Sequence, residues 1–282
     1  KNNMLMRKIK KVLKWLGAML LVFVISFLGT AAANDSLSVD QILTGTKQIV
    51  SLGENQVSQE NSLSQGIDAM ESNSTLNRLE RVFFLKQAVN ARINSANYVK
   101  LQDIPESLQQ AVVAVEDRKF YNHWGFDMEG IFRASLVNLQ YGQVREGAST
   151  ITQQLVKNLF LSQEQTMGRK AEEFVLAMDM ELNYSKDEIL ELYLNTIYFG
   201  SGYYGIKEAS EGYFGKEPAM LALPESAMLA GIPNAPSLYS PYVDFMLAKK
   251  RQFIVLDAMT AAGYLRESVA DDAKIKPIYL AH

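Results

Sequence analysis

The chain has 282 residues, 48% of them hydrophobic, which is enough for one large domain or two small ones with a substantial core. Its formal net charge is −3, and because six Lys or Arg residues fall within the first 14, the remainder is more acidic than that total. This balance excludes a nucleic-acid partner. The absence of cysteine excludes disulfides and thiolate chemistry.

The N-terminus has the pattern of a membrane anchor. Residues 15–34 carry no charge, and a run of 20 residues can cross a bilayer as a helix. The basic flank, residues 1–14, would stay on the cytoplasmic side, so we expect the rest of the chain on the outer side of the membrane. A cleaved signal peptide is the alternative, because residues 31–33 are three alanines.

Residues 35–95 are predicted to be a polar linker, because most of this stretch is rich in Ser, Asn, Gln and Glu. Within it, residues 78–93 have apolar side chains at helical spacing. This short helix would lie either at the membrane surface or packed on the main domain.

Residues 96–265 read almost entirely as helix, so the fold class is mainly α, followed by a C-terminal tail over 266–282. Pro105 suits the first turn of a helix, and Asp127 and Ser149 suit the N-caps of the next two. Ser185 and Glu188 have the spacing of a capping box, and a last amphipathic helix is expected over 247–265.

Glu116 is the first candidate for chemistry. It continues the apolar stripe formed by Leu108 and Val112, so its carboxyl group should be partly desolvated and its pKa raised, which suits a general base or acid. The alternative is a structural carboxylate paired with Arg118 or another cation.

The second candidate is the block at residues 147–158 (GASTITQQLVKN). A helix from Ser149 would place amide, hydroxyl and ammonium groups on one side, with Ile151 and Leu155 turned inward. Such a row could hold sugar hydroxyls and a phosphate, and the alternative is a solvated face. The row consists of Thr150, Gln153, Gln154 and Lys157.

The third candidate is Arg169 and Lys170, four and three residues before Glu173, on a helix expected to bury Phe174, Val175, Met178 and Leu182. The two cations could neutralise a diphosphate, or they could simply form a helix salt bridge. His123 and His282 are the only histidines, so neither a His-rich metal site nor a Ser-His-Asp triad is expected, and His123 is expected to organise the loop after Glu116.

With these residues in view, the chain resembles the peptidoglycan glycosyltransferase (transglycosylase) family, which occurs as the N-terminal domain of bifunctional penicillin-binding proteins and as monofunctional enzymes. The family's motifs occur in order at residues 116–127, 147–158, 169–173, 189–200 and 230–237. One departure is Ala148, where the family usually has a second glycine. The chain ends soon after the last motif, so we expect the monofunctional form.

The resemblance implies a lysozyme-like helical head with a smaller apolar jaw, for which Phe126, Met128, Ile131, Phe132, Leu136 and Leu139 supply the surface. It also implies lipid II as the substrate, polymerised through β-1,4 linkages with inversion and release of undecaprenyl diphosphate. A divalent cation, Mg or Mn, could assist, while no organic cofactor is implied. Other cell-wall synthesis proteins and the lipid bilayer would be partners.

By the family's mechanism, Glu116 would be the general base and Glu173 would help to stabilise the departing diphosphate. The substrate-binding residues implied by the motifs are Asp117, Arg118, His123, Ser149, Thr150, Gln153, Gln154, Lys157, Asn158, Arg169, Lys170, Asn195 and Asn234. Two other readings stay open, namely a lysozyme-like glycan-cleaving enzyme and an inactive membrane-anchored cell-wall scaffold.

Overall fold

The computed structural model describes residues 85–141, 149–161 and 167–281, and all structural statements concern these residues. They fall into two units. Residues 85–164 and 173–281 form the larger unit, whereas residues 167–172 group with the N-terminal part of the chain. Each unit is considered by itself. The expected membrane segment, residues 15–34, lies outside the described residues.

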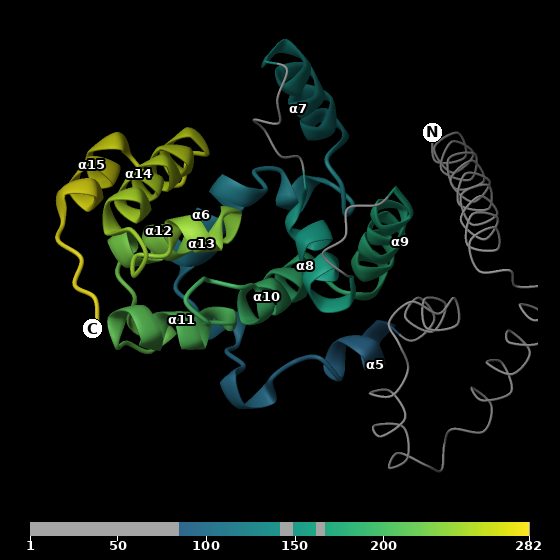
Figure 1. Ribbon diagram of the computed structural model, residues 1–282, viewed down its shortest axis with the longest axis horizontal. Helices are drawn as coiled ribbons and strands as arrows, with labels where there is room; N and C mark the ends of the chain where they lie inside the picture. The colour runs from purple at the N-terminus through teal and green to yellow at the C-terminus, as the bar shows by residue number, and fades with distance from the viewer. Residues whose placement is uncertain (1–84, 142–148, 162–166, 282) are drawn as a thin grey trace, which may run out of the picture. The chain divides into compact units, whose positions relative to one another are not determined.

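The described chain is helical, without a named strand in the ranges just given, which confirms the mainly α prediction (Figure 1). The α-helices are α5 (Leu85–Asn90), α6 (Glu106–Glu116), α7 (Met128–Tyr141), α8 (Ile151–Phe160), α9 (Met167–Asn183), α10 (Lys186–Thr196), α11 (Gly205–Phe214), α12 (Leu223–Gly231), α13 (Pro236–Tyr239), α14 (Phe245–Ala261) and α15 (Glu267–Ile275). Short 3-10 turns connect them at η1 (Ser95–Asn97), η2 (Leu101–Asp103), η3 (Phe120–Asn122), η4 (Pro218–Met220) and η5 (Ile232–Asn234).

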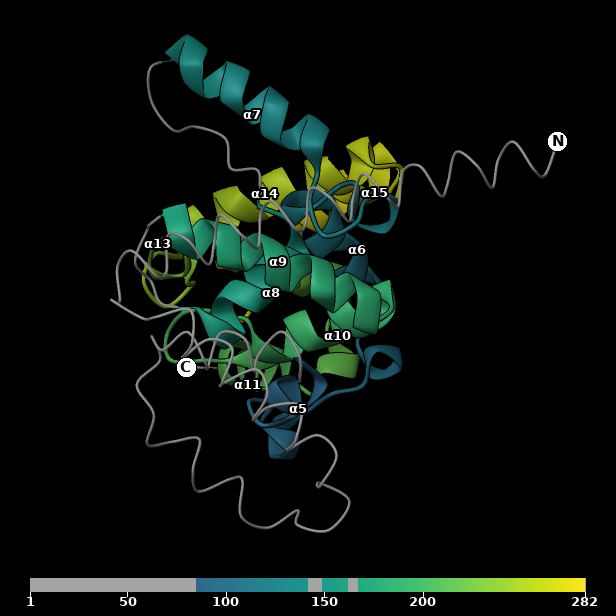
Figure 2. The ribbon, with the colours of Figure 1, turned by 90° about the vertical axis from the view of Figure 1, so that its right-hand side faces the viewer.

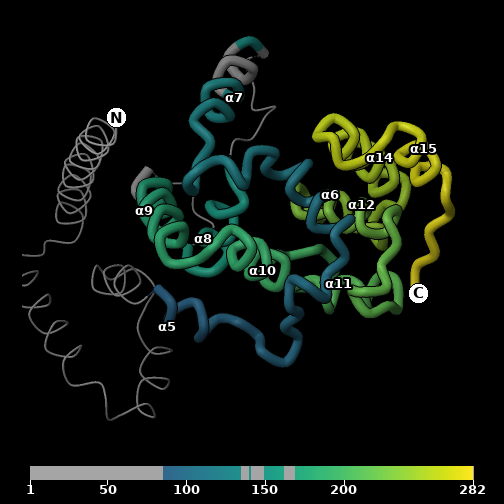
Figure 3. The backbone as a smooth tube through the Cα atoms, turned by 180° about the vertical axis from the view of Figure 1, so that it is seen from behind, coloured from purple at the N-terminus to yellow at the C-terminus, as the bar shows by residue number. Residues whose placement is uncertain are grey.

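The core of the larger unit forms where α6, α12 and α14 pack on one another, while α8 packs on α10 beside them (Figures 1 and 3). On α6, Leu108 and Val112 are fully buried, as the apolar stripe predicts. Pro105 occupies the N-cap of α6, one residue earlier than expected. The stripe ends at Glu116, the last residue of α6, which is half-buried and whose Oε1 atom is buried.

The caps of α8 and α10 show where local sequence signals hold and where they fail. The capping box at Ser185 is confirmed, with the Ser185 N–H donating to Glu188 Oε2 at 2.7 Å. For α8, the prediction of Ser149 as the N-cap is wrong: Thr150 is the N-cap, and its Oγ1 accepts the Gln153 N–H at 3.1 Å. A serine and a threonine side by side both satisfy the cap preference, so sequence alone could not separate them.

The expected break between α10 and α11 is a glycine turn. Gly205, the first residue of α11, has φ +80°, and a Cβ there would lie 2.5 Å from the Asn195 carbonyl oxygen. Only glycine therefore lets the chain turn this closely onto the end of α10. Gly202, at the tip of the same turn, has φ +90° but open space around it.

The two ends of the described chain both pack on the larger unit. Lys86 of α5 lies over the Tyr184 ring at 5.5 Å, and Arg92 lies over the Phe160 ring at 5.0 Å, which supports the packed alternative for this helix. The predicted C-terminal tail, residues 266–282, includes the helix α15, which packs on α14. Its buried side includes only small alanines, which give a weak apolar signal.

α7 stands apart from the other helices of the larger unit (Figures 1 and 2). Of the apolar residues expected on the jaw, Met128, Ile131 and Phe132 are exposed, with Phe132 exposing 67% of its surface. Phe126 instead packs against the Phe174 ring, with 4.5 Å between the ring centroids. The side chains of Leu136 and Leu139 lie outside the described residues. Among the helices described, none is long and apolar enough to cross a membrane.

Candidate active site

One carboxylate oxygen of Glu116 accepts a hydrogen bond and the other does not. Gln154 of α8 donates its Nε2–H to Glu116 Oε2 at 2.8 Å. The other oxygen, Oε1, is buried and has no hydrogen-bond partner among the described residues. A buried polar atom without a partner is costly, and in native proteins such atoms concentrate where a ligand or a reaction needs them.

Burial raises the pKa of Glu116 above its ordinary value, because desolvation disfavours the carboxylate. The hydrogen bond from Gln154 and the positive charges of Arg251 and Lys157 oppose this rise, while the neighbouring Asp117 adds to it. The direction matches the sequence prediction. A carboxylate with a raised pKa is a stronger proton acceptor than an exposed glutamate.

Gln154 is itself held by a buried tyrosine. The Tyr193 hydroxyl of α10 donates to Gln154 Oε1 at 3.2 Å. Tyr193 is fully buried, and burial together with the nearby carboxylates of Glu116 and Asp117 raises its pKa well above the ordinary value. Its hydroxyl therefore stays protonated and available as a donor over the whole physiological range.

Asp117 and His123 form an internal network. The buried Asp117 carboxylate lies 2.9 Å from His123 Nε2 through each of its oxygens, and its Oδ2 accepts the Ile151 N–H at 3.0 Å. This carboxylate therefore joins the loop after α6 to the positive N-terminal end of α8. Both residues thus organise this loop, as expected for His123.

The predicted donor row on α8 divides into two groups. Thr150 and Gln153 are buried in the capping box, where the Thr150 N–H donates to Gln153 Oε1 at 3.0 Å and the Thr150 hydroxyl donates to the Gly125 carbonyl at 2.7 Å. The cap of α8 therefore uses the polar groups of both residues. Gln154 and Lys157 remain beside Glu116. Ser149 and Asn158 are exposed.

Three further predicted site residues occupy other places. Arg118 is exposed and donates through Nη2 to the Ala261 carbonyl at 2.6 Å. Asn195 accepts the Val99 N–H at 2.7 Å and donates back to the Val99 carbonyl at 2.8 Å, so it clips the segment before α6 onto α10. Asn234 is exposed in η5.

Glu173 lies on the buried side of α9, with only 2% of its surface exposed. The predicted buried set on this helix was wrong in phase: Leu176, Ala177 and Met180 are fully buried, whereas Leu182 is 68% exposed. Glu173 lies one turn before this buried stripe, in line with it, so it is a second carboxylate on an apolar face. Arg169 and Lys170 belong to the smaller unit and are not placed relative to Glu116.

Sequence reasoning missed Arg251 and the hydroxyl of Tyr193. Arg251 of α14 donates through Nε to the Gly231 carbonyl at 3.3 Å and lies over the Tyr239 ring at 5.5 Å. It follows Ala248 by three residues and precedes Val255 by four, and both of these are buried. The rule that found Glu116, a charge on an apolar stripe, would have found Arg251 as well.

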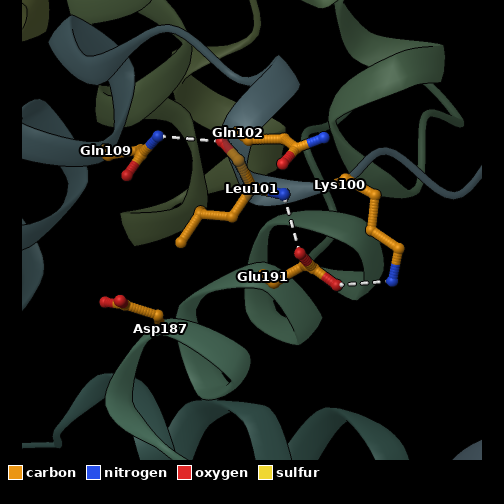
Figure 4. Close-up of a pocket in the computed structure, with 6 residues that line it drawn as sticks. All are labelled: Lys100, Leu101, Gln102, Gln109, Asp187 and Glu191. Carbon is orange, nitrogen blue, oxygen red and sulfur yellow. Dashed lines mark hydrogen bonds and ion pairs between the residues drawn. The ribbon is translucent and has the colours of Figure 1, made fainter.

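A hollow of about 570 Å³ lies elsewhere, lined by Lys100, Leu101, Gln102, Gln109, Asp187 and Glu191 (Figure 4). Its groups largely bind one another, since Glu191 accepts both the Leu101 N–H at 2.7 Å and the Lys100 ammonium at 3.3 Å. None of the predicted site residues lines it.

The centre around Glu116 therefore combines a desolvated carboxylate, one of whose oxygens is buried without a hydrogen-bond partner, with two cations close enough to act on it. Comparison with known proteins gives the family. The family model described as Transglycosylase matches residues 85–260. The chain belongs to the transglycosylase family, as the five motifs indicated.

Two relatives illustrate the similarity. Penicillin-binding protein 1A of Aquifex aeolicus is 45% identical over 181 residues, covering 64% of this chain and 25% of the relative. Penicillin-binding protein 1A of Neisseria gonorrhoeae is 50% identical over 176 residues, covering 62% of this chain and 22% of the relative. The chain thus matches about a quarter of the length of these relatives.

Among solved structures, penicillin-binding protein 1A from Haemophilus influenzae is 26% identical, with a TM-score of 0.40 and coverage of 65% of this chain and 18% of that one. A TM-score of this size establishes no shared arrangement of the elements, so the family assignment rests on the sequence.

Proposed function

We propose that this protein is a peptidoglycan glycosyltransferase that polymerises lipid II into glycan strands. The observation that carries the proposal is the desolvated Glu116 carboxylate within the transglycosylase segment, with its pKa raised and Oε1 without a hydrogen-bond partner. A base that removes a proton from a sugar hydroxyl needs these properties, together with an approach for the hydroxyl to one oxygen.

In the proposed reaction, Glu116 takes the proton of the 4-hydroxyl of the acceptor N-acetylglucosamine through Oε1. The hydroxyl oxygen attacks the anomeric carbon of the donor strand from the face opposite the diphosphate. The new β-1,4 bond forms as the bond to the diphosphate breaks, with inversion, and undecaprenyl diphosphate leaves with the bonding electron pair.

Cations are expected to stabilise the charge on the leaving diphosphate. Lys157 is close enough to Glu116 to act on its carboxylate, which supports its placement beside the reacting groups. We assign Arg169 and Lys170, with the carboxylate Glu173, to the same task on the motif evidence. The described part of the chain brings no three Asp, Glu or His side chains together as metal ligands, so no step is assigned to Mg or Mn.

The proposed cellular location is the bacterial cytoplasmic membrane. Residues 15–34 would anchor the chain in the bacterial cytoplasmic membrane, with the transglycosylase domain on the outer side where lipid II is presented. The exposed apolar residues Met128, Ile131 and Phe132 of α7 suit contact with the lipid surface. Other cell-wall synthesis proteins are proposed as partners on functional grounds alone.

The test is the product formed by the purified full-length protein in detergent. Labelled lipid II should be converted into long glycan, while preformed lipid-free peptidoglycan should remain unchanged. Cleavage of the preformed glycan would instead identify a hydrolytic enzyme, and inactivity on both substrates would favour the scaffold.

A further inference from the structure

Three side chains from three helices form one hydrogen-bonded line that ends at the proposed base. Tyr193 of α10 donates to Gln154 Oε1 at 3.2 Å, and Gln154 of α8 donates through Nε2 to Glu116 Oε2 at 2.8 Å. Tyr193 has no exposed surface, and Gln154 is the partner of its hydroxyl within the described residues. The packing of α8 on α10 holds the first two members together.

The tyrosine decides which end of the amide faces the base. A glutamine side chain has an acceptor end and a donor end, and these exchange places when the amide turns over. If Gln154 were reversed, its carbonyl oxygen would meet a Glu116 oxygen, which is tolerable only when the carboxyl group carries a proton. Reversal would also turn the NH₂ group toward Tyr193, whose hydroxyl proton would then lose its acceptor, so the Tyr193 hydroxyl disfavours that reversal.

We propose that Tyr193 is a positioning residue for Glu116: it locks the Gln154 amide with its NH₂ group toward Oε2 and leaves Oε1 as the oxygen that receives the substrate proton. The role as base rests on the proposed function, whereas the effect of Tyr193 on the ionisation of Glu116 does not depend on it.

The effect of the Tyr193 hydroxyl on the ionisation of Glu116 can be separated from the effects of the neighbouring charges. The charged groups that act on Glu116 are Arg251 from α14, Lys157 from α8 and the adjacent Asp117. On α12, which also packs against α6, Glu225 is bound to the Lys216 ammonium at 2.5 Å. Removing only the Tyr193 hydroxyl leaves all of these groups in place.

The experiment is a direct titration of the Glu116 carboxyl carbon by ¹³C NMR in the full-length protein, with the signal assigned by its loss in Glu116→Gln. In Tyr193→Phe the amide is free to reverse, so the Glu116 pKa should rise by about one pH unit, the scale of a hydrogen bond to a charged group. An unchanged titration would overturn the proposal.

Tyr213→Phe is the matched control. Tyr213 is also fully buried, and its hydroxyl donates to the Phe199 carbonyl at 2.8 Å and lies 2.9 Å from Ser240 Oγ, which can donate to it. Tyr213→Phe should destabilise the fold without changing the pKa of Glu116. A shift of the Glu116 pKa as large as that in Tyr193→Phe would show a general effect of loosened packing. It would contradict the positioning role of Tyr193.

Polymerisation of lipid II supplies the functional readout. The acid limb of the kcat profile should move up by the same amount in Tyr193→Phe, with the rate recovering at high pH, whereas mere structural damage lowers the rate at every pH. If Tyr193→Phe does not fold, Gln154→Met removes the amide donor at similar length and should raise the Glu116 pKa at least as much. Inactive native protein would overturn the proposed function. The titration would still test whether Tyr193 orients the Gln154 amide.

Discussion

Replacing Glu116 by glutamine should stabilise the folded protein at neutral pH, because the native carboxylate is held in a place that disfavours its charge. The amide keeps the shape of the side chain and can still accept the hydrogen bond that Gln154 donates at 2.8 Å. Burial raises the pKa of Glu116 above the 4.5 of an unperturbed glutamate. The substitution therefore removes the unfavourable ionised state, together with the smaller attraction that Arg251 and Lys157 exert on it.

The sign of the pH dependence follows from proton linkage. Between pH 4.5 and the higher pKa of the folded state, native protein holds a proton on Glu116 that unfolded chain has lost. The free energy of unfolding of the native protein therefore falls across this window, by at most about 1.4 kcal/mol per pH unit for one proton. The glutamine variant has no such loss.

Thermal unfolding of both full-length proteins in the same detergent, from pH 4.5 to 8, measures the difference. The advantage of Glu116→Gln should be smallest at the acid end and grow with pH, at about 2 to 4 °C of Tm per kcal/mol for a domain of this size. Glu225→Gln, which weakens the ion pair with Lys216, should lower Tm at neutral pH. We predict that the Tm difference between Glu116→Gln and native protein grows with pH. A difference that is constant or shrinks as pH rises would refute the claim that the Glu116 carboxylate is desolvated.

Three other substitutions test the framework around the site. Thr150→Ala should cost about 1 to 2 kcal/mol in chemical denaturation, because it removes the N-cap of α8. Asp117→Asn should cost about 1.5 to 3 kcal/mol by weakening charge-assisted hydrogen bonds, and a stability equal to native protein would contradict the network. Gly205→Ala should be much more harmful than Gly202→Ala, which costs only about 1 to 2 kcal/mol for its φ, because a Cβ at Gly205 meets the Asn195 carbonyl. Equal melting temperatures for the two alanine variants would show that this contact is relaxed.

Much of the helical framework could be predicted because its signals are local. The Ser185 capping box and the buried stripe of α6 depend on residues within a few positions of one another. The position of Glu116 on that stripe was also readable, and burial raises its pKa as expected. The same reasoning misplaced the buried side of α9, where Leu182 is exposed, because several apolar phases compete on that helix.

The parts of the site that escaped prediction depend on contacts between distant segments. Gln153 and Gln154 look equivalent in sequence, yet one closes a capping box and the other reaches Glu116, 38 residues earlier. Arg251 approaches the same carboxylate from α14, a helix that carries no recognised motif. These roles depend on contacts between segments that are distant in the sequence, so local sequence patterns cannot predict them.

The most direct test of the central claim is the rate of lipid II polymerisation by Glu116→Gln beside native protein and Glu225→Gln. Loss of a general base predicts a rate at least about 10²-fold lower in Glu116→Gln, with a folded protein and with near-native activity in Glu225→Gln. Near-native polymerisation by Glu116→Gln would contradict the assignment of the base.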